Sequence, residues 1–192
     1  MASTLTLLSL FIPTLVSALP DVTPIQVGAG TCYDFPNWQD VAGSDITGGF
    51  FFHPDQADNS TIDGLYTSVE VFNKTIIDIT TNAEEAKEAY YCINGSVKEY
   101  YTDTPVYISE TNGELAFLDS GFVPEVYQHQ VDGVTLDGVF LGYADVTAWA
   151  YTFVASTGGA GIVDTFTMRL LEEQDAPLED GEFYGFLKIA SV

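Results

Sequence analysis

Three acidic residues lie in segments with apolar or β-branched neighbours, where a carboxyl group can serve in acid–base catalysis. They are Glu70, Asp78 and Asp164, flanked as Val-Glu-Val, Ile-Asp-Ile and Val-Asp-Thr. Hydrolysis of glycosides uses two carboxyl groups, one kept protonated by its surroundings and the other ionised. Partial burial would raise the pKa of such a carboxyl group and suit it to the protonated role. These residues are therefore the candidates for a carboxylate-dependent hydrolase.

The same pattern also has a purely structural interpretation. Along a strand that is buried on one face, an acid between two apolar residues usually points to solvent. Glu70 fits this alternation well, whereas Asp78 fits it less well because Ile76 lies on the same face of the strand. Catalysis by these acids is therefore the second of two functional hypotheses.

Other catalytic chemistries have less support in the sequence. There is no Gly-x-Ser-x-Gly motif of the kind that exposes a nucleophilic serine on a sharp turn. The two histidines, His53 and His129, are not spaced as metal ligands on one strand or helix. We expect both to be solvated or hydrogen-bonded side chains.

Aromatic residues make up 14% of the chain and offer flat apolar surfaces for sugar rings or protein partners. The candidates are Tyr90-Tyr91, Tyr100-Tyr101, Trp38 and Trp149. Most of them should pack in the core, and Trp149 has the small neighbours expected there. Trp38 follows Pro-Asn in a polar segment, so it is the candidate for an exposed binding residue.

The N-terminal segment is typical of a cleaved secretory signal. An apolar run from Leu5 to Val16 is followed by Ser17-Ala18. Pro13 interrupts the run, which is shorter than the roughly 20 residues that cross a bilayer. We expect residues 1–18 to be a signal peptide and residues 19–192 to form a single secreted, extracellular domain without membrane insertion.

Two further features agree with secretion. Cys32 and Cys92 are the only cysteines, and an oxidising compartment would join them in a disulfide bond. Asn59, Asn73 and Asn94 each begin an Asn-x-Ser/Thr triplet without proline. They are therefore candidate N-glycosylation sites on the surface.

The chain is strongly acidic, with 28 Asp and Glu residues against 5 Lys and Arg and a formal net charge of −23. Nucleic acid is therefore not an expected partner, because binding to phosphates needs clustered basic residues. Solubility is the simplest role of the charge. Calcium is the alternative, with residues 55–59 and 175–180 as candidate loops, although neither has the spacing of a calcium-binding helix–loop–helix. No other metal or cofactor is expected.

Short β-branched and aromatic segments separated by turn residues predict an all-β or β-dominated fold. We expect about ten strands, including segments 48–53, 65–72, 75–80, 97–101, 146–155, 162–171 and 183–189. Asn112-Gly113 and Asp132-Gly133 predict hairpin turns. Such strands bury their apolar faces in either a β-sandwich or a β-barrel.

One short helix is predicted over residues 83–92. Asn82 is a suitable cap, Glu85 completes a capping box, and Gly95 would end the helix. The disulfide would then attach this helix to the segment around Cys32.

Together these features predict a secreted, disulfide-bonded acidic glycoprotein. The leading hypothesis is an extracellular binding or surface-interaction module for a glycan, a cell wall or a host partner. The alternative is the carboxylate-dependent hydrolase, acting on an extracellular polymer.

Overall fold

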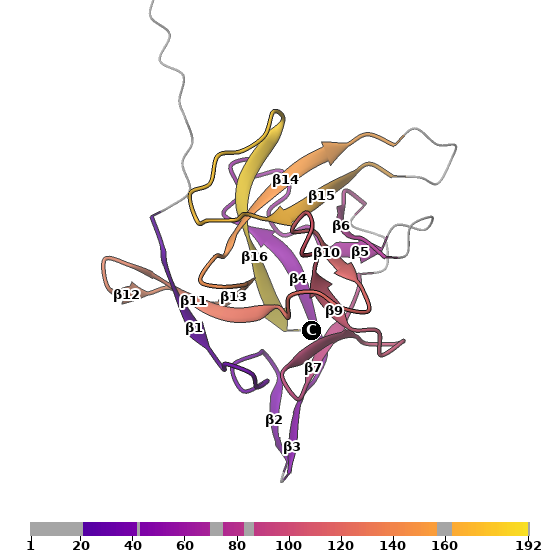
Figure 1. Ribbon diagram of the computed structural model, residues 1–192, viewed down its shortest axis with the longest axis vertical. Helices are drawn as coiled ribbons and strands as arrows, with labels where there is room; N and C mark the ends of the chain where they lie inside the picture. Colours follow the sequence, from indigo (N-terminus) through magenta and orange to yellow (C-terminus); the bar gives the residue numbers. More distant parts are fainter. Residues whose placement is uncertain (1–20, 42, 70–74, 83–86, 157–162, 192) are drawn as a thin grey trace, which may run out of the picture.

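The protein is all-β in the part of the chain that the computed structural model describes, residues 21–41, 43–69, 75–82, 87–156 and 163–191 (Figure 1). These ranges contain sixteen strands, most of them short: β1 (Thr23–Val27), β2 (Trp38–Val41), β3 (Ser44–Thr47), β4 (Phe50–Asp55), β5 (Thr67–Val69), β6 (Ile77–Thr80), β7 (Tyr90–Ile93), β8 (Ser96–Glu99), β9 (Val106–Ile108), β10 (Leu115–Phe117), β11 (Glu125–Val131), β12 (Val134–Thr135), β13 (Val139–Gly142), β14 (Ala148–Val154), β15 (Thr165–Leu170) and β16 (Glu182–Ser191). The expected number of about ten strands is therefore too low. The predicted signal peptide lies outside the described residues.

The helix predicted over residues 83–92 is wrong where the structure describes it, from residue 87 onward. Tyr90 to Ile93 form β7, and β8 pairs with it in an antiparallel hairpin. Asn94 and Gly95 form the turn, with φ angles of 50° and 72°. These are the positive φ values of a two-residue hairpin turn, for which Asn-Gly is the preferred sequence. Gly95 therefore makes a hairpin turn rather than ending a helix.

Fourteen strands form one antiparallel sheet with the order β2-β3-β7-β4-β16-β14-β15-β6-β5 along its main path. The two end strands of this path, β2 and β5, are not paired with each other. The sheet is therefore open within the described residues, and the barrel alternative is wrong. The β9–β10 hairpin is a separate two-stranded sheet. Its segment joins the main sheet through isolated bridges from Ala116 to Ile76 and from Glu114 to Arg169.

The long strand β16 connects the parts of the main sheet and runs through the middle of the molecule (Figure 1). Its first half pairs with β14, and its second half pairs with β4. β13 also pairs with the second half of β16. On its other edge β13 pairs with β11, which in turn pairs with β1. One strand therefore supports both the β2–β4 region and the β1–β11–β13 branch.

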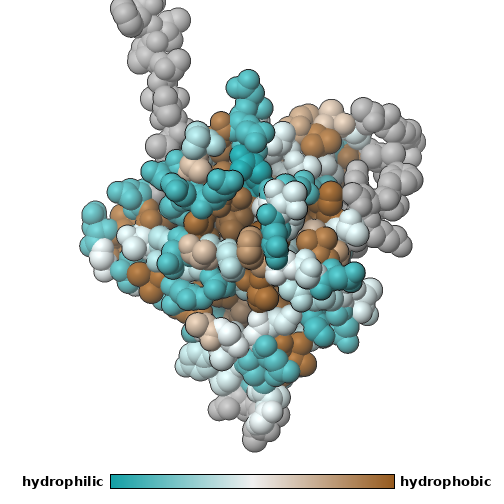
Figure 2. All heavy atoms as spheres, in the orientation of Figure 1, coloured by the Kyte–Doolittle hydropathy of each residue, from teal (hydrophilic) through white to brown (hydrophobic). Residues whose placement is uncertain are grey.

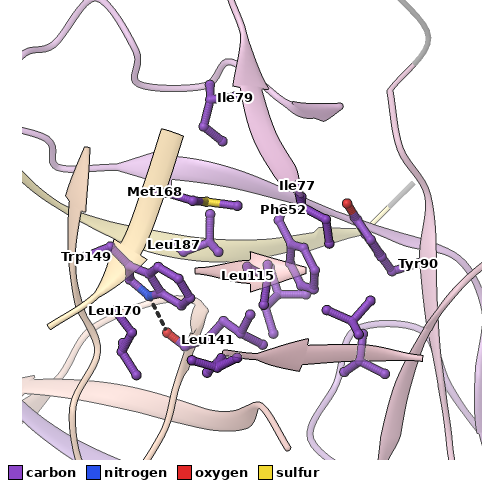
Figure 3. Packing of buried hydrophobic residues seen from close by; sticks show 14 of the residues in the cluster. Phe52, Ile77, Ile79, Tyr90, Leu115, Leu141, Trp149, Met168, Leu170 and Leu187 are labelled. Atoms are coloured by element: carbon purple, nitrogen blue, oxygen red, sulfur yellow. Dashed lines mark hydrogen bonds between the residues drawn. The ribbon is translucent and has the colours of Figure 1, made fainter. Parts of the chain in front are cut away.

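The main core is built from strands that come from every part of the sheet. Phe52, Tyr90, Leu141, Trp149 and Leu187 are fully buried in one cluster. Trp149 donates a hydrogen bond from Nε1 to the carbonyl oxygen of Leu141 at 2.9 Å, so its polar atom is satisfied inside the core (Figure 3). The core position predicted for Trp149 is confirmed.

A second, smaller apolar cluster contains Val22, Phe140 and Phe186. The ring of His129 stacks on Phe140 at a centroid distance of 3.9 Å and meets Phe186 edge-on at 4.4 Å. His129 is fully buried, and its Nε2 lies 2.8 Å from the hydroxyl oxygen of Thr147. His129 is therefore hydrogen-bonded, as expected, but it is a core residue and not a solvated side chain on the surface of a strand.

The predicted disulfide between Cys32 and Cys92 is present, with the Cα atoms 5.6 Å apart. Both cysteines are fully buried in the main core. Because Cys92 belongs to β7, the bond attaches this strand to the segment between β1 and β2, not to a helix.

The visible surface is mixed in hydropathy. Figure 2 shows hydrophilic side chains over much of one face, with hydrophobic side chains between them. None of the described ranges holds a helix with the length and hydrophobicity needed to cross a membrane.

Candidate functional site

The candidate catalytic acids do not come together. Glu70 lies outside the described residues. Asp78 and Asp164 belong to neighbouring strand segments, where Thr80 pairs with Thr165 and Ile79 pairs with Phe166. Side chains alternate along a strand, so Asp164 lies on the face of Phe166 and Ile79, whereas Asp78 lies on the opposite face. These two carboxyl groups therefore do not form a catalytic pair across one cleft.

Each of these two acids has a structural environment of its own. Asp78 is only 4% exposed, so it is not the solvent-facing acid that simple alternation suggests. Asp164 accepts a hydrogen bond from the backbone N–H of Ser156 at 2.8 Å. Its carbonyl oxygen also accepts hydrogen bonds from the backbone N–H and the hydroxyl of Thr81. Asp164 thus connects the ends of β14 and β15 to the residue after β6.

Trp38 is half-buried and packs against the main core. The ring of Tyr33 lies edge-on to it at a centroid distance of 4.9 Å and is itself 60% exposed. The exposed aromatic residue at this end of the molecule is therefore Tyr33, while Trp38 mainly supports it.

The candidate glycosylation sites differ in their surroundings. Asn73 lies outside the described residues, and Asn94 is exposed at the tip of the β7–β8 hairpin. Asn59 is half-buried, and its side-chain oxygen accepts hydrogen bonds from the backbone N–H and the hydroxyl of Thr61. Asn94 is the described site whose side chain is more open to solvent.

The two candidate calcium loops are stabilised by contacts of their own. Asp63 accepts the backbone N–H of Ala57 at 2.9 Å, and Asp55 lies 3.8 Å from the ammonium group of Lys188. In the second loop, the backbone N–H of Glu179 donates a hydrogen bond to the side-chain carboxylate of Glu182. The described residues contain no group of three or more His, Cys, Asp or Glu side chains that could hold a metal ion.

The site with the strongest binding chemistry is a tyrosine-rich cavity of about 560 Å³ beside β4 and β7. We call its lining the tyrosine platform: Asn37, Gly49, Phe51, Lys87, Ala89, Tyr100 and Tyr101. Tyr100 is 50% exposed and Tyr101 is 81% exposed, although tyrosine is usually more buried. Exposed aromatic rings beside a cavity are a common feature of binding sites.

The strand pattern explains why these side chains share one face. In β4, Phe50 and Phe52 face the core, so Phe51 faces the other way. Phe50 pairs with Tyr90, and the backbone N–H of Tyr100 donates to the carbonyl oxygen of Ala89 at 2.9 Å. Ala89 and Tyr100 are therefore neighbours on the platform side of the sheet.

The rings of the platform continue into further aromatic contacts. Tyr101 meets Tyr100 edge-on at 5.5 Å, and Tyr100 meets Tyr91 edge-on at 6.0 Å. At the other end, the ring of Tyr66 lies 5.5 Å from that of Phe51. The ammonium nitrogen of Lys87 lies 3.6 Å from the centroid of Tyr66, which is a cation–π distance. The site therefore combines flat apolar rings with a positively charged hydrogen-bond donor.

Glu99 fixes the loop that presents the two exposed tyrosines. Its side-chain carboxylate accepts hydrogen bonds from the backbone N–H groups of Tyr101, at 2.8 Å, and Thr102. Its own N–H donates to the carbonyl oxygen of Thr104, and its carbonyl oxygen accepts the N–H of Asp103. Glu99 is only 4% exposed. Several hydrogen bonds to this one residue therefore set the path of residues 100–104.

A second carboxyl group, that of Glu88, is hydrogen-bonded to Glu99. We call these two residues the glutamate pair. Burial, the hydrogen bond to Glu99 and the charge of Glu99 together raise the pKa of Glu88 to about 7. Burial opposes ionisation of Glu99 as well, but hydrogen bonds from Thr102 and Tyr101 lower its pKa below the usual value. The two opposite shifts favour a pair in which Glu88 keeps its proton while Glu99 is ionised.

The glutamate pair lies outside the lining of the tyrosine platform. Glu99 pairs with Tyr90 across β7 and β8, so the two side chains share the core-facing side. Glycosidases separate their two carboxyl groups by roughly 5–9.5 Å to fit a water or a sugar carbon between them. The glutamate pair is in direct hydrogen-bond contact, which favours a role in positioning rather than in glycoside hydrolysis.

Two other cavities have less binding chemistry. One of about 510 Å³ lies beside Phe122, Tyr143 and Arg169. The guanidinium group of Arg169 is held by both carboxylate oxygens of Glu182, at 2.7 and 2.6 Å. Another, of about 470 Å³, is lined by residues 26–31 and 121–126 together with Phe35, Gly95 and Tyr143. Neither is lined by a highly exposed aromatic ring.

Only part of this site is predictable from the sequence. Tyr100 and Tyr101 stand out as adjacent aromatics, but Phe51 and Lys87 become neighbours only when β4 and β7 pair. Glu88 lay in the predicted helix, and Glu99 in a predicted strand without a partner. The Asn-Gly pair at residues 94–95 was the available signal, because a hairpin there places Glu99 beside the residues that precede β7.

Comparison with protein-family models gives no match to this chain, and comparison with curated proteins gives none either.

Proposed function

We propose that the protein is a secreted binding module that holds a neutral glycan on the tyrosine platform. The observation that carries this proposal is the cavity of about 560 Å³ with two highly exposed tyrosine rings at its edge. Sugar rings present flat faces of C–H groups, which pack on aromatic rings, and hydroxyl groups, which need hydrogen-bond partners. The tyrosine hydroxyls and Lys87 supply such partners.

The charge of the protein supports a neutral ligand over an anionic one. The formal net charge is −23, and the platform lining includes a single cation, Lys87. Polymers of uronic acid or sulfated sugars would be repelled by this field. Neutral polymers of hexoses, pentoses or N-acetylated amino sugars carry no such penalty.

The positions of the candidate acids favour binding over hydrolysis. Of the candidate acids, Asp78 and Asp164 lie on opposite sides of the sheet, and neither lines the platform. Secretion rests on the features of residues 1–18, the disulfide and the candidate glycosylation sites, all of which suit a protein that meets extracellular glycans.

The test is a calorimetric titration of the purified secreted protein with neutral hexasaccharides of β-linked glucose, N-acetylglucosamine, xylose or mannose. We expect at least one of them to bind and Tyr101→Ala to weaken it about tenfold, which corresponds to about 1.4 kcal/mol. Tyr101 is 81% exposed, so its removal should leave the fold intact.

Tyr33→Ala is the matched control, because Tyr33 is also a highly exposed tyrosine but lies outside the platform. It should bind the same hexasaccharide as the wild type does. Equal losses in the two variants, or the absence of binding to every hexasaccharide, would refute the proposed site.

A further inference from the structure

The loop that carries the two exposed tyrosines is attached to the glutamate pair. Tyr90 pairs with Glu99, and the N–H of Tyr100 donates to the carbonyl oxygen of Ala89, so Glu88 and Glu99 lie on the same side of the hairpin. The carboxylate of Glu99 holds the backbone N–H groups of Tyr101 and Thr102, and Glu88 is hydrogen-bonded to that carboxylate. Glu88 is itself anchored by its backbone N–H, which donates to the carbonyl oxygen of Thr67 in β5 at 3.0 Å. The pair thus links β5, β8 and the loop that carries both exposed tyrosines.

We propose that the proton shared by Glu88 and Glu99 controls the tyrosine platform, so that glycan binding weakens when Glu88 loses its proton. With the proton present, Glu88 donates a hydrogen bond to the Glu99 carboxylate, and that carboxylate keeps Tyr101 and Thr102 in place. Without it, two carboxylates in contact repel each other. Glu99 then separates from Glu88 at the expense of its hydrogen bonds to the loop.

Among the described residues, two tyrosines and one lysine are the other titratable groups near the pair that bear on its charge. Burial raises the pKa of Tyr90, which faces the pair from β7, well above its usual value. Burial and the hydrogen bond to Asp103 raise the pKa of Tyr91 to about 12. Both tyrosines therefore stay neutral at physiological pH. The ammonium group of Lys87 lies over the ring of Tyr66, and the charge that acts on Glu88 is that of Glu99.

The direction of the pH dependence follows from the raised pKa of Glu88. Ionisation becomes half complete near pH 7, so the ordered platform is favoured at acidic pH and lost as the pH rises through 7. By linkage, a glycan that binds the ordered platform raises the pKa of Glu88 in return. A tenfold change in affinity corresponds to a rise of about one unit in that pKa.

The test measures the order of the loop and the affinity for the ligand in two separate experiments. Hydrogen exchange of the Tyr101 and Thr102 amides is followed from pH 5 to pH 8.5 without ligand, and hexasaccharide affinity is measured over the same range. In the wild type we expect the protection factors, corrected for the intrinsic pH dependence of exchange, to fall with a midpoint near 7. The affinity should fall about tenfold in parallel.

Glu88→Gln should remove both dependences, because glutamine still donates a hydrogen bond to Glu99 but never becomes charged. Glu173→Gln, at an exposed glutamate, is the control and should retain the wild-type behaviour. Protection that does not change with pH in the wild type, or an equal decline in Glu88→Gln, would overturn the proposal.

The inference about binding rests on the proposed function, and the two can fail separately. If no hexasaccharide binds at any pH but protection still falls near pH 7 only when Glu88 is present, the glycan proposal is wrong and the proton control stands. If hexasaccharides bind with an affinity that does not depend on pH, the proton control is wrong and the binding site stands.

Discussion

The histidine at position 129 illustrates how burial sets the chemistry of single residues in this protein. Its ring is fully buried between Phe140 and Phe186, and Thr147 is its hydrogen-bond partner. Burial lowers the pKa of His129 to about 4. The side chain is therefore neutral in the folded protein at any pH well above 4, and it acts as an aromatic core residue with one polar contact.

Because His129 is buried in its neutral form, we expect the free energy of unfolding to depend on pH in the acidic range. Between pH 6.5 and pH 4 the unfolded chain binds a proton at His129 and the folded chain does not, so stability falls as the pH falls through this window. The full loss is about 3 kcal/mol for a shift of this size. His129→Phe should reduce by that amount the difference in unfolding free energy between pH 7 and pH 4, measured by urea denaturation.

His53 is present in both proteins, the wild type and His129→Phe, so a difference between them on acidification reports on His129. If His129→Phe loses as much stability on acidification as the wild type does, His129 is not kept neutral by its surroundings.

Individual residues were predictable from the sequence where one chemical property determines their place. The two cysteines could pair only with each other, and Trp149 had the small neighbours of a core residue. Asp78 was less predictable: its two isoleucine neighbours suggest an outward-facing acid and Ile76 argues against this, and in the structure Asp78 is buried in β6, which lies between β5 and β15. That arrangement depends on strands far apart in the chain.

The β7–β8 hairpin is the element on which the candidate site depends. Its turn, Asn94-Gly95, has nearly the same φ angles as Asp132-Gly133 between β11 and β12. The two turns differ in their surroundings. A Cβ at Gly95 would collide with the carbonyl oxygen of Gly30, next to the disulfide segment, whereas a Cβ at Gly133 would meet nothing within 4 Å.

Alanine substitutions in these two turns distinguish the stability cost of backbone strain from that of close packing. Gly133→Ala should cost about 1 kcal/mol, because alanine disfavours a positive φ. Gly95→Ala should cost about 2 kcal/mol more, because the backbone of Gly30 must also move. Thermal and urea unfolding of the two variants would measure the difference, and equal costs would show that the β7–β8 turn does not pack tightly on residues 28–31.

At the level of elements, the strands and turns were easier to predict than their partners. The Asp132-Gly133 turn is present as predicted. The β9–β10 hairpin also forms, but its loop spans residues 109–114 and only Gly113 has a positive φ there. Residues 87–92 were misassigned because a capping pattern and two glutamates favour a helix locally, while the alternating burial of Tyr90, Tyr91 and Cys92 places them in a sheet.

The described part of the molecule is mainly one open antiparallel sheet, and the chain carries a strongly negative charge. The all-β class followed from the short strand segments, but the order of strands did not, because β16 pairs with strands from both halves of the chain. The tyrosine platform arises from this order, since it joins residues from the N-terminal third with the loop after β8. Under the proposed function, the overall charge would disfavour anionic glycans at this site.

The central claim is that neutral glycans bind at the tyrosine platform. The most direct measurement is a map of backbone amide chemical shifts during titration with the neutral hexasaccharides and, for comparison, with an oligomer of galacturonic acid. We predict shifts that gather at Phe51, Lys87, Ala89, Tyr100 and Tyr101 for a neutral hexasaccharide and no shifts for the anionic oligomer. The absence of shifts with every neutral hexasaccharide, or shifts confined to the cavity beside Arg169, would contradict the claim.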